Sequence, residues 1–81
     1  MDYKALAKSI LHDIGGEENV ISFTHCATRL RFNLKDDSKV VKKHLDATKG
    51  VMGVVNKGGQ FQVVIGNHVK DAYEEVLKLV S

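Results

Sequence analysis

The sequence predicts an α+β fold, a two-layer sandwich in which a four-stranded, mostly antiparallel sheet carries three helices on one face. Apolar residues recur every third or fourth position near both ends of the chain, as they do in amphipathic helices. Between these ends lie two pairs of short extended stretches, each pair joined by a turn, and a short helix separates the pairs. The predicted order is therefore α-β-β-α-β-β-α, and the two hairpins favour an antiparallel sheet covered on its apolar face.

The first helix is predicted over residues 3–14. Its apolar stripe consists of Tyr3, Leu6, Ala7, Ile10, Leu11 and Ile14, which fall on one side of a helix. Asp2 is a suitable N-cap, because its carboxylate can accept hydrogen bonds from N–H groups of the first turn. Gly15 and Gly16 follow, and glycine readily adopts the left-handed conformation that ends a helix.

The first hairpin is predicted from residues 19–24 and 29–34. The earlier stretch is rich in β-branched and aromatic residues, which favour extended structure. The later stretch alternates strictly, with Leu30, Phe32 and Leu34 on one face and Arg29, Arg31 and Asn33 on the other. Residues 25–28, His-Cys-Ala-Thr, then form the tip of the hairpin.

The remaining elements are a short helix, a second hairpin and a final helix. Residues 36–38, Asp-Asp-Ser, offer caps for the short helix, which ends before Gly50. That helix is expected to contain Val40, Val41, His44 and Leu45. Residues 51–55 and 60–65 are predicted strands, with a Lys-Gly-Gly turn between them. The final helix, over residues 69–80, has an apolar stripe of Val69, Ala72, Tyr73, Val76, Leu77 and Val80.

The composition narrows the class of protein. A chain of 81 residues is expected to form a single domain, 1–81, with a thin core. The formal net charge of +2 is too small to demand a nucleic-acid partner, so we expect none. The single cysteine cannot form an internal disulfide, and no apolar run approaches the roughly 20 residues of a membrane-spanning helix. Since the N-terminal residues also lack the pattern of a signal peptide, we expect a cytoplasmic protein.

The strongest functional signal lies in residues 24–31, around the single cysteine. Cys26 is predicted at the hairpin tip among polar residues, and Arg29 and Arg31 follow on one strand face. Nearby cations lower the pKa of a thiol and so generate the nucleophilic thiolate, and a guanidinium binds phosphate oxygens in a bidentate manner. The pattern therefore favours a reactive Cys26 that accepts phosphate over a buried, inert cysteine. His25 is interpreted as a loop residue that tunes this site.

The turn after Cys26 is a candidate phosphate-binding loop. Backbone N–H groups of Ala27, Thr28 and Arg29 can point at an anion, and the Thr28 hydroxyl is a further donor. Other chemistries fit less well. Four residues separate Cys26 from Arg31, whereas a phosphatase loop needs five, and a thioredoxin-like pair needs a second cysteine. The spacing of the histidines matches no zinc pattern, so neither a metal nor a cofactor is expected.

These residues resemble the signature of a known family, the enzyme IIB domains of the bacterial sugar phosphotransferase system in its glucose/sucrose/β-glucoside branch. That signature runs Asn, a hydrophobic residue, five variable residues, Cys, one variable residue, Thr, Arg, and then alternating hydrophobic residues before an acidic or amide residue. The matching residues are Asn19, Val20, Cys26, Thr28, Arg29, Leu30, Phe32, Leu34 and Asp36. The likeness extends over nearly the whole chain, including residues 50–55 and 59–66.

The resemblance implies a protein-phosphocysteine–sugar phosphotransferase domain. Such domains accept phosphate on the cysteine, here Cys26, from a histidine of enzyme IIA and pass it to a sugar bound by the membrane-embedded enzyme IIC. Arg29 and Arg31 match the arginines that the family needs for transfer to the sugar. The family fold agrees with the fold predicted above from the residues alone. The resemblance also implies a location at the inner face of the cell membrane, with Met1 as a natural start and enzyme IIC following Ser81.

Two other functions remain open on the sequence. One is a regulatory or sensor module that keeps the enzyme IIB fold without net sugar phosphorylation, although the intact motif speaks against it. The other is an RNA-binding module, because residues 50–53 fit the Gly-x-x-Gly clamp of a KH domain. In a KH domain that loop joins two helices, whereas a strand is predicted to follow it here. The sugar and the particular enzyme IIA partner are not specified by this sequence.

Overall fold

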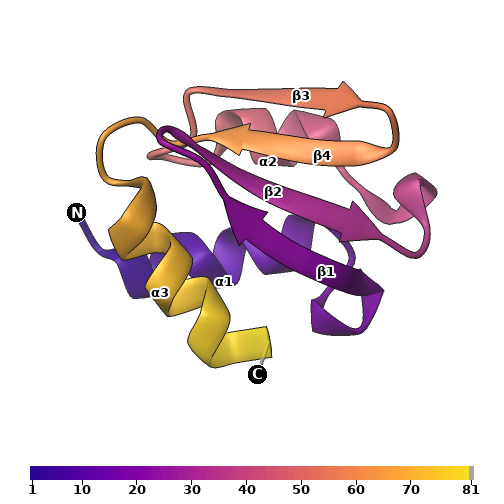
Figure 1. Ribbon diagram of the computed structural model, residues 1–81, viewed down its shortest axis with the longest axis horizontal. Helices are drawn as coiled ribbons and strands as arrows, with labels where there is room; N and C mark the ends of the chain where they lie inside the picture. The colour runs from indigo at the N-terminus through magenta and orange to yellow at the C-terminus, as the bar shows by residue number, and fades with distance from the viewer. Residues whose placement is uncertain (81) are drawn as a thin grey trace.

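The computed structural model describes residues 1–80 and shows helices and strands in the predicted order (Figure 1). The elements are α1 (Tyr3–Asp13), β1 (Val20–His25), β2 (Arg29–Leu34), α2 (Lys42–Ala47), β3 (Gly53–Lys57), β4 (Gln60–Val64) and α3 (Val69–Val80). Short 3-10 turns, Glu17–Asn19 and Asp37–Lys39, precede β1 and α2. The predicted fold class, α+β with three helices and four strands, is confirmed.

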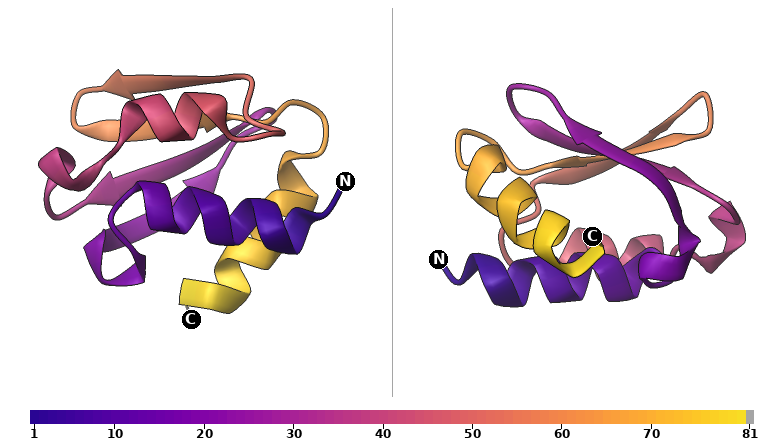
Figure 2. Two further views of the ribbon diagram at one scale, coloured as in Figure 1. Left: turned by 180° about the vertical axis from the view of Figure 1, so that it is seen from behind. Right: turned by 60° about the horizontal axis from the view of Figure 1, so that its bottom comes forward.

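The four strands form one sheet in the order β1-β2-β4-β3, and all three neighbouring pairs are antiparallel. The helices pack on one face of this sheet and leave the other face uncovered (Figure 2). The alternation read from residues 29–34 sets these two faces. Leu30 and Phe32 are fully buried towards the helices, while Arg29 and Arg31 lie on the open face.

The core lies between the sheet and the helices. It comprises Leu6, Ala7, Ile10, Leu11, Ile14, Leu30, Phe32, Leu34, Leu45, Phe61, Val63, Ile65, Val69, Ala72 and Val76. The stripes predicted for the two long helices supply much of this set, so periodicity identified the buried sides correctly. Burial of these side chains is the main source of stability in a domain of this size.

The first strand of the second hairpin is shifted by two residues from its prediction at both ends, so Lys57, expected in the turn, belongs to the strand. The third strand runs from Gly53 to Lys57, because the N–H of Val51 still bonds the carbonyl of Thr48 in a turn, at 3.0 Å. The connection to β4 is only two residues long. Gly58 and Gly59 both have positive φ angles, +60° and +83°, as a tight hairpin turn of this handedness requires.

The caps predicted for the short helix belong to another element. The Asp36 carboxylate accepts a hydrogen bond from the Ser38 N–H at 2.9 Å, and so caps the 3-10 turn rather than α2. The chain leaves helical geometry at Val40, and the N–H of Val41 donates to the carbonyl of Asp13 at 2.8 Å. This tertiary bond to the end of α1 delays the start of α2 to Lys42, so Val40 and Val41 lie outside the helix.

Candidate functional site

Backbone hydrogen bonds hold the tip of the β1–β2 hairpin, one within the turn and two to the loop between β4 and α3. The N–H of Cys26 donates to the carbonyl of Arg29 at 2.9 Å and closes the turn. The carbonyl of Thr28 accepts from the N–H groups of Ile65 and Gly66, each at 2.9 Å. The tip is thereby attached to the loop that connects β4 with α3, beside which it lies in Figure 1. Residues far apart in the sequence thus build one rigid end of the sheet.

Cys26 lies at this tip, as the sequence predicted. Its thiol is half-buried and is not part of a disulfide. The backbone N–H of Thr28 lowers the pKa of the thiol most, and partial desolvation opposes it. The N–H of Arg29 and the guanidinium of Arg31 lower the pKa further, to about 7. Three donor groups therefore favour the thiolate, and the same groups can stabilise an anion bound to the sulfur.

The two arginines share the open face of the sheet but have different partners. The Nη1 of Arg29 donates to the side-chain Oε1 of Gln62 on β4 at 2.9 Å. The guanidinium of Arg31 contributes to the lowered pKa of the Cys26 thiol, and within residues 1–80 its buried Nε has no hydrogen-bond partner. A buried donor without a partner is costly, so the Arg31 guanidinium is incompletely satisfied within the described residues.

The exposed Ala27 and Thr28 complete the turn between β1 and β2. His25 lies on the other side of the hairpin. Its Nδ1 is 3.0 Å from the carbonyl oxygen of Cys26, and its ring centre is 4.3 Å from that of Tyr73 on α3. His25 thus supports the backbone of the tip from the helix side, while the arginines approach from the open face.

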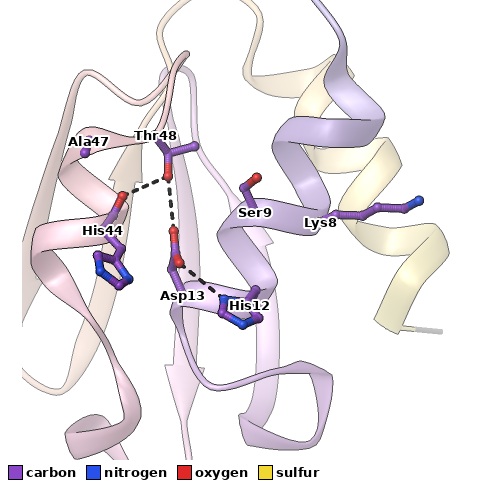
Figure 3. Close-up of a pocket in the computed structure, with 7 residues that line it drawn as sticks. All are labelled: Lys8, Ser9, His12, Asp13, His44, Ala47 and Thr48. Carbon is purple, nitrogen blue, oxygen red and sulfur yellow. Dashed lines mark hydrogen bonds and ion pairs between the residues drawn. The ribbon is translucent and has the colours of Figure 1, made fainter.

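A separate hollow lies between α1 and α2 (Figure 3). It encloses about 590 Å³ and is lined by Lys8, Ser9, His12, Asp13, His44, Ala47 and Thr48. The Asp13 carboxylate accepts a hydrogen bond from the Thr48 hydroxyl at 3.1 Å, and Nδ1 of His12 is 3.5 Å from its other oxygen. In residues 1–80 no group of three histidine, cysteine or acidic side chains can hold a metal ion, here or elsewhere.

Two polar residues, Asp13 and Gln62, are buried in the structure and were not predicted to be so from the sequence. A signal for Gln62 was present, since Gln60 and Gln62 alternate with the apolar Phe61 and Val63 and so share a face with the arginines of the neighbouring strand. Asp13 gave no comparable signal, because an acidic residue at the end of an amphipathic helix is usually exposed. None of the helices within residues 1–80 has the length and apolar character to cross a membrane.

Comparisons with known proteins identify relatives of the whole chain. The family model described as phosphotransferase system, EIIB matches residues 8–40. The β-glucoside-specific EIIBCA component of Halalkalibacterium halodurans is 52% identical over 98% of this chain and 12% of its own length. The arbutin-, cellobiose-, and salicin-specific EIIBC component of Escherichia coli is 46% identical over 98% of this chain and 16% of its own length. The chain therefore spans less than a fifth of either relative.

A solved structure agrees with these relatives. The crystal structure of one domain of the PTS system IIabc component from Clostridium difficile superposes with a TM-score of 0.89 at 40% sequence identity. The match covers 95% of this chain and 81% of that one. The likeness therefore extends to the arrangement of the whole domain, beyond the segment around the cysteine.

Proposed function

The chain belongs to the EIIB family of the phosphotransferase system, and from that premise we propose that residues 1–81 form a phosphocarrier domain whose Cys26 accepts a phosphoryl group and passes it to a sugar. The observation that carries the proposal is the position of Cys26 at the hairpin tip, where the N–H groups of Thr28 and Arg29 and the Arg31 guanidinium lower the pKa of its thiol. These groups stabilise negative charge, first on the thiolate and then on the phosphoryl oxygens bound to it. The activity is that of a protein-phosphocysteine–sugar phosphotransferase.

In the first step the Cys26 thiolate attacks the phosphorus atom of a phosphohistidine. An S–P bond forms, the P–N bond breaks, and its electron pair stays on the histidine nitrogen. Because the pKa of Cys26 is lowered to about 7, a large part of the thiol is already ionised at neutral pH. The attack on phosphorus therefore needs no separate base to deprotonate the thiol. Arg29 and Arg31 neutralise the phosphoryl oxygens, and the N–H groups of residues 27–29 orient them.

In the second step a sugar hydroxyl attacks the phosphorus atom. An O–P bond forms, the S–P bond breaks, and its electron pair returns to sulfur as the thiolate. The hydroxyl proton leaves to a base that the sugar-binding domain or water supplies. A thiol of low pKa is a good leaving group, so the donors that activate Cys26 as a nucleophile also favour its release.

The partners are an enzyme IIA domain as phosphodonor and a membrane-embedded enzyme IIC domain that holds the sugar. The relatives support this assignment, since the name EIIBCA combines all three parts in one protein and the name EIIBC combines the B and C parts. Cys26 would then work in the cytoplasm at the inner face of the cell membrane. Several of the relatives are specific for β-glucosides or for arbutin, cellobiose and salicin, so these are the first sugars to test.

Mass spectrometry tests the first step. The chain is incubated with phosphoenolpyruvate, the upstream carriers and enzyme IIA, and wild type should gain one phosphoryl group. Cys26→Ser should gain none, with its circular dichroism spectrum as the control for folding. An unphosphorylated wild type, or equal labelling of Cys26→Ser, refutes the proposal. A phosphorylated chain that passes its phosphate to no sugar in vesicles containing enzyme IIC supports a regulatory module instead.

A further inference from the structure

Gln62 connects the two arginines of the site. Its backbone pairs with Arg31 in the β2–β4 ladder, whereas Arg29 lies nearer the hairpin tip, opposite Val64. The side-chain Oε1 of Gln62 accepts the 2.9 Å hydrogen bond from Nη1 of Arg29. The Arg29 side chain therefore leans along the open face of the sheet, away from the tip and from the thiol.

The Gln62 amide is held in one orientation. Its side chain belongs to a residue that is only 6% exposed, although no helix covers this face of the sheet. A guanidinium has only donors, so the amide oxygen must face Arg29. The amide Nε2 donates in turn to Oε1 of Gln60 at 3.1 Å. Because both ends of the amide are bonded and it is buried, Gln62 restricts the guanidinium that it binds.

The two arginines consequently act on Cys26 through different groups. The Thr28 N–H lowers the pKa of the thiol most, Arg29 adds only its backbone N–H, and Arg31 adds its guanidinium. A neutral amide holds the Arg29 guanidinium without cancelling its charge, and leaves its other N–H groups free for an anion. A carboxylate in this place would form an ion pair with Arg29 and would compete with a phosphoryl group.

We propose that Gln62 is a positioning residue that holds the Arg29 guanidinium off the resting thiolate, so that Arg29 engages the phosphoryl group once it is bound to Cys26. The inference rests on the proposed function. It assigns Arg31 to the thiolate and to the phosphoryl group, whereas Arg29 acts only in the phosphorylated state. A thiolate paired with both guanidiniums would be a weaker nucleophile, so the separation serves the first step as well as the second.

Two titrations on the same variants test whether Arg29 and Arg31 act on different states of Cys26. Phosphorus NMR of the phosphorylated chain gives the pKa of the phosphate on Cys26, and the pH dependence of alkylation by iodoacetamide gives the pKa of the free thiol. The variants are Gln62→Met, which keeps the shape and removes the acceptor, and Gln62→Glu, which adds a charge. The matched control is Asn33→Leu, because the Asn33 amide lies on the same face and bonds Ser22 at 2.7 Å rather than an arginine.

In Gln62→Met the pKa of the phosphate should rise by about 0.5, because a loosely held guanidinium favours the dianion less. The pKa of the thiol should stay the same or fall, since Arg29 is then free to approach it. Gln62→Glu should raise the pKa of the phosphate further, and Asn33→Leu should match wild type. If Gln62→Met does not fold, Gln62→Glu still decides.

The outcomes separate this inference from the proposed function. An unchanged phosphate pKa in the Gln62 variants overturns the inference and leaves the proposed function intact. A raised thiol pKa in Gln62→Met also overturns it, because that result marks a general loosening of the site. A wild-type chain that accepts no phosphate on Cys26 overturns both.

Discussion

The hairpin tip around Cys26 and the hollow between α1 and α2 are both polar regions, but their donors and acceptors are arranged in opposite ways. In the hollow, the buried Asp13 carboxylate already has partners in Thr48 and His12. At the tip, the N–H groups of Thr28 and Arg29 and the Arg31 guanidinium lower the pKa of one thiol, and the buried Nε of Arg31 is without a partner in residues 1–80. The hollow is a shallow, open depression of about 590 Å³, whereas the tip is an exposed turn.

The difference shows that, in a domain of this size, the volume of a surface hollow does not indicate where the reactive residues lie. Phosphoryl transfer needs aligned donors and an accessible nucleophile, and a turn supplies both. The polar groups of the hollow bond one another and join α1 to α2, so their role is structural. Substitutions at the tip should therefore change phosphate transfer and the alkylation of Cys26. Substitutions in the hollow should change the free energy of unfolding.

Arg31→Lys should reduce phosphate transfer to the sugar by about 100-fold. A lysine keeps the charge but lacks the planar fork that bonds the thiol and two phosphoryl oxygens together. Transfer is measured as labelled sugar phosphate formed in vesicles that contain enzyme IIC. His44→Gln, in the hollow, is the control and should transfer at the wild-type rate. Equal rates in wild type and Arg31→Lys would remove this guanidinium from the mechanism.

Asp13→Ala should lower the free energy of unfolding by about 2 kcal/mol, because hydrogen bonds to a buried charged group are worth about that much. Urea denaturation measures the loss, and Lys8→Gln, at an exposed side chain of the same hollow, is the control and should leave the free energy of unfolding unchanged. The rate at which Cys26 is alkylated should not change in the folded variant. A slower alkylation would show that the hollow and the hairpin tip are coupled, and would contradict a purely structural role for Asp13.

The sequence was sufficient to predict the parts of the site that depend on local pattern. Strict alternation placed Arg29 and Arg31 on one face, and the polar surroundings of Cys26 placed it at a hairpin tip. It could not predict which N–H groups point at the sulfur, since that depends on the geometry of the turn. Nor could it pair Arg29 with Gln62, because that bond joins strands that lie far apart in the chain.

Asn19 shows why a family signature does not separate chemistry from structure. It opens the signature, yet it is 1% exposed and its Nδ2 donates to the carbonyls of Ile14 and Asp36 at 2.7 and 3.0 Å. Its Oδ1 accepts from the Asp36 N–H at 2.9 Å. The residue therefore joins the end of α1 to the loop after β2. Only the folded chain reveals this role, since Ile14 and Asp36 meet through tertiary structure.

The alkylation rate of Cys26 should rise with pH with a midpoint of about 7, and Arg31→Gln should move that midpoint upward. The cation favours the thiolate, so its removal raises the pKa and slows alkylation severalfold at pH 7. The backbone N–H of Thr28 remains, so the pKa should stay below that of an ordinary cysteine. Lys8→Gln removes a cation from the hollow and should leave the midpoint unchanged. An unshifted midpoint in Arg31→Gln would contradict the contact between guanidinium and thiol.

The smallest effect is expected for Thr48→Val in the hollow. The Thr48 hydroxyl lies 3.1 Å from the Asp13 carboxylate and 2.9 Å from the carbonyl of His44, and it carries one proton for these two acceptors. Its loss should therefore cost about 0.5 kcal/mol, near the lower end for a hydrogen bond. That corresponds to a fall of roughly 3 °C in the melting temperature. The control is Ser9→Ala, at an exposed hydroxyl of the same hollow, which should leave the melting temperature unchanged. A change in the alkylation rate of Cys26 in Thr48→Val would contradict a purely structural role for Thr48.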